Sequence, residues 1–314
     1  MKKLTLNSSI LIVGSGFGDY CVRKSFQKLG FKKISFISRK KKISNFATYY
    51  DLNEYQKKSL NSPDIVYIAS VPKIQNKIFF KLLDQFHESK IILEKPVFTS
   101  IDDNNKYKKI LKIKRDNVIV NFIYRYVHEF NLLKKKLKNE EIISINIEWF
   151  FKSYNNFYNI NSWKKFKSKG GGVLNYFGSH VFGYIFYFFG KWKRIKKITN
   201  QNSIYEGIVY YESFKIFIKL NCNSNYFTHH KMTIKTKENI FQLNNINKSQ
   251  FNFELLKNSK KIYTKSCNYQ KLNSNDDVRI NFLLKLIDSF ILKRNYNYTI
   301  INDAVWITRK YLML

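Results

Sequence analysis

Cysteine is scarce in this chain of 314 residues, and Cys21, Cys222 and Cys267 are far apart. A small fold stapled by disulfides is therefore unexpected, and the cysteines do not have the spacing to the five histidines that a metal site shows. With 44% apolar and 17% aromatic residues, the chain can bury the cores of two ordinary domains, which argues against wholesale disorder. We expect a globular protein without a metal site, in a reducing compartment such as the cytoplasm.

The sequence also lacks internal repeats and a linker rich in glycine and serine. Two domains should then be packed together rather than tethered. At the amino terminus, two lysines precede a short apolar run, but Ser8 and Ser9 interrupt it and no cleavage site of small residues follows. We expect no signal peptide and assign the run to a strand.

Acidic residues are few, because 22 Asp and Glu stand against 56 Lys and Arg, giving a formal net charge of +34. One interpretation is a surface that binds a polyanion such as nucleic acid or anionic lipid. The other is compositional drift under AT-rich codons, since 48 basic residues are Lys, Asn reaches 35 and Ala only 3. The lysines are scattered and arginine is rare, so we favour drift and expect no specific nucleic-acid partner.

Charged residues are absent from Gly170 to Gly190, and Lys169 and Lys191 flank this segment as they would a membrane span. Six glycines dilute it, however. Its strongly apolar part, 181–189, covers only about half of the ~20 residues that a span needs. The phenylalanines recur at helical spacing (Phe182, Phe186 and Phe189). We expect a buried helix and no membrane span.

Strands alternate with helices over the first part of the chain. Apolar runs predict strands at 9–13, 31–37, 64–69 and 90–93, with helices at 22–30 and 74–86 between them. This alternation is typical of a doubly wound parallel sheet with right-handed crossovers, an α/β fold.

The pattern changes near residue 120. After a strand at 118–122 and a helix through Leu137, longer alternating runs follow at 142–150, 204–211, 214–220 and 231–236. They predict a mainly antiparallel sheet with one solvated face, and helices at about 277–292 and from 302 close the chain. We expect one domain at 1–120 and another at 121–314, with the last helix packing back on the first domain.

A glycine-rich turn separates the first strand from the first helix, with the sequence Gly14-Ser15-Gly16-Phe17-Gly18. Such a turn lets backbone N–H groups approach a pyrophosphate at the amino terminus of a helix. An ordinary tight turn is the alternative, but the place after the first strand favours dinucleotide binding. Asp19 occupies the usual third-glycine position, where a carboxylate is awkward beside phosphate, and Gly18 offers the missing room.

The second strand ends at Ser38 and Arg39, and no acidic residue follows until Asp51. NAD enzymes commonly place an acid here to bind the ribose hydroxyls, whereas NADP enzymes place Arg or Ser against the 2′-phosphate. We therefore favour NADP over NAD as the cofactor.

Several motifs together make the chain resemble a known family over nearly its whole length. They are Gly14-Ser15-Gly16, Ala69-Ser70-Val71-Pro72, Glu94-Lys95-Pro96-Val97, Tyr124-Arg125-Tyr126 and the run from Gly170-Gly171-Gly172 to Gly178-Ser179-His180. The family is Gfo/Idh/MocA, oxidoreductases named after glucose-fructose oxidoreductase and inositol dehydrogenase. The resemblance implies a nicotinamide-binding Rossmann domain and a second domain with an open-faced sheet, through which the protein forms a homo-oligomer. It also implies hydride transfer at a hydroxyl-bearing carbon of a sugar, cyclitol or nucleotide sugar.

The resemblance gives three residues catalytic roles. The lysine of Glu-Lys-Pro bridges cofactor and substrate in the family, here Lys95, and such a group can donate to a substrate oxygen and stabilise alkoxide charge. His180 matches the family's catalytic histidine, whose usual partner is an Asp four residues earlier, where this chain has Tyr176. The phenol of Tyr176 can donate a proton. Alternatively Tyr176 is packing, and His180 acts alone, is a core histidine, or belongs to an inactive site.

The remaining candidates line the expected cofactor and substrate sites. For the cofactor they are Gly14, Ser15, Gly16, Phe17, Gly18, Ser38, Arg39, Ala69, Ser70, Pro72, Gln75, Glu94 and Lys95, with Gln75 in place of a histidine common in the family. For the substrate they are Lys95, Tyr124, Arg125, Trp163, Asn175 and His180, preceded by Ile123 in place of a common Asn. Arg125 either binds an anionic group or braces the domain interface, and Trp163 either stacks on a sugar or belongs to the core.

These patterns predict an NAD(P)-dependent oxidoreductase acting on a sugar or nucleotide sugar. Two alternatives remain open: a catalytically silent nucleotide-binding protein, and a basic protein that binds polyanions.

Salt dependence separates the last alternative from compositional drift. If drift produced the charge, DNA or heparin should bind weakly and be released near physiological ionic strength, at about 0.15 M salt. Affinity that survives this salt concentration in a titration with DNA would instead indicate a dedicated polyanion site.

Overall fold

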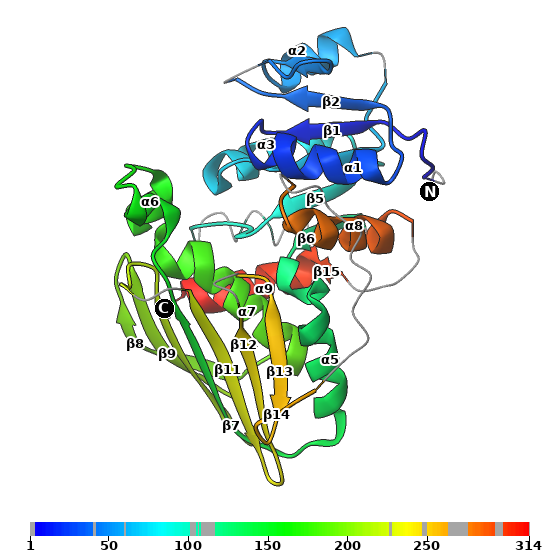
Figure 1. The fold of residues 1–314 in the computed structure, drawn as a ribbon. Helices are drawn as coiled ribbons and strands as arrows, with labels where there is room; N and C mark the ends of the chain where they lie inside the picture. Colours follow the sequence, from blue (N-terminus) through cyan, green and yellow to red (C-terminus); the bar gives the residue numbers. More distant parts are fainter. Residues whose placement is uncertain are drawn as a thin grey trace. The chain divides into compact units, whose positions relative to one another are not determined.

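The computed structural model describes residues 4–39, 42–59, 61–100, 105, 107, 117–225, 228–246, 250–262, 276–292 and 298–313 (Figure 1). It divides into two compact units. The first comprises Met1–Ile123 and Tyr269–Trp306, and the second comprises Tyr124–Asn268 and Ile307–Leu314. The first unit thus contains a late segment, residues 269–306, that the sequence analysis placed in the second domain, 121–314.

The first unit is built on a seven-stranded sheet in the order β15-β6-β5-β4-β1-β2-β3. Its strands are β1 (Ile10–Val13), β2 (Ile34–Ile37), β3 (Ala47–Tyr49), β4 (Ile65–Ile68), β5 (Lys90–Glu94), β6 (Val118–Asn121) and β15 (Thr299–Ile300). All pairs are parallel except β15 with β6. Every residue of β1 and β4 is buried, as expected for central strands covered on both faces. The predicted α/β Rossmann-type fold is confirmed.

Helices pack on both sides of this sheet (Figure 1). They are η1 (Gly18–Arg23), which is π-helical, α1 (Lys24–Lys28), α2 (Leu52–Lys58), α3 (Pro72–Gln85) and α8 (Arg279–Phe290). The ammonium groups of Lys24 and Lys28 lie 2.8 and 3.4 Å from the carboxylate of Asp276, just before α8. These ion pairs attach the late segment to the first helix. The sequence patterns did not predict β3 and α2.

The second unit contains an eight-stranded sheet in the order β14-β13-β12-β11-β7-β10-β9-β8. Its strands are β7 (Ile142–Phe150), β8 (Arg194–Asn200), β9 (Ile204–Tyr210), β10 (Lys215–Asn221), β11 (His229–Thr236), β12 (Ile240–Asn245), β13 (Phe253–Lys257) and β14 (Lys260–Lys261). Among these strands, only the neighbours β7 and β10 are paired in parallel. The predicted, mainly antiparallel sheet is confirmed.

The two faces of this sheet differ. In β7, Ile145, Ile147 and Trp149 are buried, whereas Asn146 on the other face is exposed. Helices pack on the buried face, among them α5 and α7. The remaining described helical segments are η2 (Ile123–Tyr126), α5 (His128–Lys136), η3 (Leu137–Asn139), α6 (Tyr154–Phe157), η4 (Trp163–Lys165), η5 (Lys167–Lys169), η6 (Leu174–Gly178), α7 (Ser179–Phe189) and α9 (Ile301–Leu312). The boundary between the two units falls within η2 and within α9.

The uncharged segment 170–190 forms π-helical η6 and then α7, as the predicted buried helix requires. Val181 and Ile185 are fully buried with Phe182, while Phe186 and Phe189 are only half-buried. The buried face of α7 therefore includes Val181, Phe182 and Ile185, whereas the predicted face was Phe182, Phe186 and Phe189. Within the described ranges, no helix has the length and apolar character needed to cross a membrane.

Candidate functional site

The glycine turn begins directly after β1, where the backbone of Gly14 lies against Ala69, the residue that follows β4. Gly14 has a φ of +110°, and a Cβ there would lie 2.6 Å from the carbonyl oxygen of Ala69. Ala69 in turn donates its N–H to the carbonyl of Val13, at 2.8 Å. Only glycine fits both the conformation and the space at position 14.

The other two glycines of the turn have different surroundings. At Gly16, a Cβ would meet no described atom within 4 Å, so the turn is open to solvent there. At Gly18, a Cβ would lie 2.8 Å from Cγ2 of Ile12 on β1. Gly16 therefore leaves room for a ligand, and Gly18 lets η1 pack against the strand. Between them, Phe17 is half-buried and packs edge-on against Tyr20, with 5.8 Å between ring centroids.

The carboxylate of Asp19 is neutralised on its own helix. Its Oδ1 accepts from Nε of Arg23 at 2.8 Å, one helical turn away. The π-helix η1 begins at Gly18, so the glycine motif still places a helix amino terminus at the turn.

Ser70 lies directly after β4 and beside this turn, since a Cβ on Gly14 would be 3.5 Å from its backbone nitrogen. The Ser70 hydroxyl oxygen is buried, and none of the described residues forms a hydrogen bond with it. Pro72 then begins α3 at a position where its missing N–H costs nothing. The open Gly16, the unsatisfied Ser70 hydroxyl and the helix amino terminus fit the pyrophosphate of a dinucleotide.

The end of β2 carries Ser38 and Arg39. Ser38 donates its N–H to the carbonyl of Tyr49 at 2.9 Å, and the exposed guanidinium of Arg39 lies 5.3 Å from the ring centroid of Tyr50. The first acid of the sequence after this strand, Asp51, caps α2 by accepting from the N–H of Glu54 at 3.0 Å. It is therefore committed to the helix rather than to a ribose.

Gln75 holds the turn that carries Lys95. Its side chain is fully buried, and its Nε2 donates to the carbonyls of Glu94 at 2.7 Å and Pro96 at 3.3 Å. Its Oε1 accepts from the N–H of Glu94 at 3.2 Å. The Lys95–Pro96 peptide bond is cis. Gln75 thus supports the half-buried Lys95 from below, and its predicted cofactor contact stays a prediction.

The carboxylate of the half-buried Glu94 belongs to the same turn. It accepts from the hydroxyl of Tyr67 at 2.6 Å and from Nδ2 of Asn121 at 2.9 Å. Burial raises the pKa of Glu94, although these two hydrogen bonds oppose the change. The strand residues Tyr67 and Asn121 were not predicted, because they look like ordinary members of buried strands.

Arg279, from the late segment of the first unit, also escaped prediction. Its guanidinium lies 4.8 Å from the ring centroid of Phe17 in the glycine turn and donates to the Asp277 carboxylate at 2.6 and 2.9 Å. Burial lowers the pKa of Arg279, but the hydrogen bonds and ion pair with Asp277 outweigh burial and raise it overall. A permanent cation therefore stands beside the turn, and it also donates to the hydroxyl of Tyr20, 259 positions earlier in the sequence.

In the second unit, His180 lies in the first turn of α7 among aromatic rings. Its ring centroid is 5.2 Å from that of Tyr124, which is 1% exposed and donates its hydroxyl to the carbonyl of Gln250 at 3.1 Å. Burial raises the pKa of Tyr124 well above its usual range. Tyr124 therefore packs beside His180 as a neutral phenol whose hydroxyl is already engaged.

A second histidine, His230 on β11, completes this cluster and was not predicted. Its ring stacks on Trp149 with centroids 4.4 Å apart and an interplanar angle of 6°, and its Nε2 is 3.2 Å from the hydroxyl of Tyr184. Burial, aided by the neighbouring His229, lowers the pKa of His230 to about 3. This ring is neutral in the folded protein at ordinary pH.

Tyr176 lies on η6 and is half-buried. Trp163 packs edge-on against its ring at 5.8 Å between centroids, and Nζ of Lys164 lies 5.0 Å from the same ring. Asn175 beside it is 5% exposed. Trp163 and Tyr176 thus lie together, as a shared substrate site would require.

Arg125 is half-buried, and its guanidinium lies 4.7 Å from the ring centroid of Tyr187. Tyr187 lies on α7 of the same unit, so this contact joins η2 to α7. Substrate binding and bracing of the domain interface both stay predictions for Arg125.

Comparison with known proteins agrees with these features. The model of the Gfo/Idh/MocA family, described as an oxidoreductase family with an NAD-binding Rossmann fold, matches residues 8–122. The resemblance predicted from the motifs is confirmed over this part of the chain. No curated protein matches the sequence significantly.

Solved structures of dehydrogenases share the fold over nearly the whole length. D-galactose-1-dehydrogenase from Rhizobium etli is 12% identical with a TM-score of 0.75, and the match covers 100% of this chain and 97% of that one. Levoglucosan dehydrogenase is 12% identical with a TM-score of 0.76, covering 96% and 94%. The WlbA (WbpB) dehydrogenase from Thermus thermophilus, solved with NAD and UDP-GlcNAcA, is 11% identical with a TM-score of 0.68, covering 98% and 94%.

The buried His230 makes a pH-dependent contribution to stability. The unfolded chain takes up a proton near pH 6.5, whereas the folded ring does so only near pH 3. Below pH 6.5 the unfolded state therefore binds more protons, and the free energy of unfolding should fall by up to about 1.4 kcal/mol per pH unit. We expect His230→Gln to remove this part of the decline when urea unfolding is measured between pH 6.5 and 5. The exposed His87→Gln serves as the control, and equal slopes for both variants would contradict the assignment.

Proposed function

Because residues 8–122 match a family of oxidoreductases with an NAD-binding fold, we propose that this protein transfers hydride between a nicotinamide cofactor and a hydroxyl-bearing carbon of a sugar or nucleotide sugar. The observation that carries the proposal is the placement of two turns in the first unit. The glycine turn follows β1 and the Lys95 turn follows β5, with only β4 between these parallel strands. Ligands of doubly wound sheets bind at this carboxyl edge.

The chain's own residues would bind, orient and handle protons. A bound nicotinamide supplies the acceptor or donor of hydride. The ammonium of Lys95 would donate a hydrogen bond to the substrate oxygen and stabilise the negative charge that develops there as the hydroxyl proton is removed, before departure of the hydride converts the alkoxide to a carbonyl. We assign removal and return of the hydroxyl proton to His180 with Lys95, and to Tyr176 as a further acid.

We favour NADP over NAD for a physical reason. The guanidinium of Arg39 is exposed at the end of β2, where a 2′-phosphate would lie, and Asp51 is occupied as a helix cap. An arginine there can bind phosphate oxygens in a bidentate manner. We also propose a cytoplasmic location, since Cys21 and Cys222 are both free and buried.

Cofactor binding is the first experiment. Gly16→Ala should keep the thermal stability of the wild type, because its Cβ meets no described atom, yet weaken NADPH at least tenfold by filling the space of the pyrophosphate. Arg39→Ala should weaken NADPH about tenfold, or about 1.4 kcal/mol, and NADH much less. Fluorescence titration of each variant measures both effects. Lack of binding of either cofactor to the wild type would overturn the proposed function.

Turnover then separates an active enzyme from a silent nucleotide-binding protein. With a sugar that the wild type oxidises, Lys95→Ala should lower kcat by about 100-fold or more while the cofactor still binds. A wild-type protein that binds cofactor but turns over no sugar or nucleotide sugar would favour the silent alternative.

We further propose that the open face of the second sheet joins two copies of the chain. Four neighbouring strands present charges of alternating sign at one level of this face, in the order Lys231, Glu148, Lys219 and Glu206. Such a row is self-complementary across a two-fold axis. Phe217 on the same face is 41% exposed and supplies apolar area.

The mass of the particle in sedimentation analysis tests the proposed dimer. Phe217→Asp should leave the fold intact, since the side chain is on the exposed face, and shift the particle towards the monomer in sedimentation analysis. The exposed Ile74→Asp on α3 is the control and should not change the mass. A wild-type protein that sediments as a monomer would contradict the proposal.

A further inference from the structure

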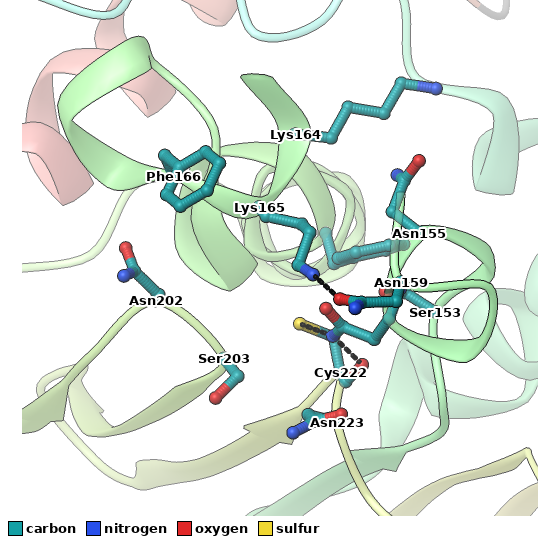
Figure 2. Close-up of a pocket in the computed structure, with 12 residues that line it drawn as sticks. Ser153, Asn155, Asn159, Lys164, Lys165, Phe166, Asn202, Ser203, Cys222 and Asn223 are labelled. Carbon is teal, nitrogen blue, oxygen red and sulfur yellow. Dashed lines mark hydrogen bonds between the residues drawn. The ribbon is translucent and has the colours of Figure 1, made fainter. Parts of the chain in front are cut away.

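A polar pocket in the second unit belongs to none of the predicted sites. It encloses about 340 Å³, within the range of small-molecule sites. Its walls come from the segment around α6, from η4 and the residue after it, from η6, from the turn between β8 and β9, and from the two residues after β10 (Figure 2). Five separate segments thus line a space large enough for a sugar with an attached phosphate.

Most side chains that line the pocket are polar and uncharged or positively charged. Five asparagines, two serines and two lysines line it, whereas no Asp or Glu is among the described lining residues. Amides and hydroxyls both donate and accept hydrogen bonds, as sugar hydroxyls require. Phe166 and Phe177 add apolar surface against which a sugar face can pack. The composition selects a ligand rich in oxygen and negatively charged.

The two lysines of the pocket are consecutive, Lys164 and Lys165 in η4. Nζ of Lys165 is 3.4 Å from Oδ1 of Asn159, a long contact between exposed groups that Figure 2 shows across the pocket wall. Nζ of Lys164 lies against the ring of Tyr176. Neither ammonium pairs with a carboxylate of the described residues, so both charges remain uncompensated by acids.

The pocket is built for binding rather than for covalent chemistry. Its cysteine, Cys222, is buried, and burial raises the pKa of the thiol to about 11. Its carbonyl accepts from Nδ2 of Asn156 at 2.8 Å, a bond that fixes α6 against the end of β10. The thiol is therefore uncharged at neutral pH, and the wall around it is rigidly tied.

Lys164 connects this pocket with a residue of the candidate active site. It lines the pocket and also contacts Tyr176, and Phe177, which follows Tyr176 in η6, lines the pocket as well. We propose that the pocket binds the phosphoryl group and adjoining hydroxyls of a phosphorylated sugar, with its reacting carbon directed towards Tyr176. This inference rests on the proposed oxidoreductase function and specifies its substrate class.

Isothermal titration with glucose 1-phosphate tests the proposal, with UDP-glucose and unphosphorylated glucose as further arms. The double variant Lys164→Gln/Lys165→Gln should weaken glucose 1-phosphate at least tenfold. The matched control, Lys260→Gln/Lys261→Gln, removes two consecutive exposed lysines from β14 and should leave the affinity unchanged. Because both variants lower the net charge equally, a difference between them reports the pocket rather than the general positive field.

A second variant tests the wall without deleting a lysine. Asn159 has a φ of +49°, a conformation that Asp also tolerates, so Asn159→Asp should fold normally and weaken glucose 1-phosphate by placing a carboxylate in the pocket. Stronger binding of UDP-glucose than of glucose 1-phosphate would identify a nucleotide sugar, and the reverse a simple sugar phosphate. Either result supports the proposal if Lys164→Gln/Lys165→Gln loses affinity for the ligand that the wild type prefers.

Three outcomes would overturn the proposal: no binding of either phosphorylated ligand, equal losses in the double variant and its control, or equal affinity for glucose and glucose 1-phosphate. NADPH titration of the same variants keeps this failure distinct from failure of the proposed function. Lys164→Gln/Lys165→Gln should bind NADPH as the wild type does. If these variants lose affinity for the phosphorylated ligand but still bind NADPH, the oxidoreductase proposal is unaffected.

Discussion

The close approach of the Gly14 backbone to the carbonyl of Ala69 is the constraint on which the first unit's site depends. It exists because β1 and β4 are paired in parallel, with Val13 opposite Ile68, so that both strands end at the same level. The pairing of Ile68 with Leu93 extends this level to β5. Three turns therefore emerge side by side at one edge: the glycine turn, the Ser70 turn and the Lys95 turn. A side chain at position 14 would separate the first two.

Below that edge, Gln75 departs from the family pattern but still forms hydrogen bonds with the backbone of the turn. Gln75 occupies a histidine position, yet its amide offers a donor and an acceptor together and binds both the N–H and the carbonyl of Glu94. Glu94 is in turn held by Tyr67 and Asn121. The turn that carries Lys95 is thus supported by a hydrogen-bond network that runs from Gln75 through Glu94 to Tyr67 and Asn121, so glutamine in place of the common histidine still holds the turn.

The predictable parts of the molecule are those fixed by local pattern. The buried strands β1, β4 and β5 are continuous apolar runs, and the alternation in β7 and β10 marks a sheet with one exposed face. The strand β3 has no buried residue, so no periodic pattern of apolar residues predicts it. Arg279 and His230 owe their places to tertiary contacts with Phe17 and Trp149, which no spacing along the chain reveals. The Tyr176 substitution was visible, but its neighbour Lys164 was one lysine among 48.

Because acidic residues are scarce, the abundance of lysine affects the electrostatic field of the protein. Several acids that remain have structural partners: Asp64 accepts from the N–H and hydroxyl of Ser9, Asp51 caps α2, and Glu140 accepts from Thr236 and Asn239. The described wall of the polar pocket has none. The excess of lysine raises the positive field around the protein and so the encounter rate with phosphorylated ligands. It cannot by itself select a site, since selection requires enclosed donors without competing carboxylates, and the pocket beside Tyr176 combines these two conditions.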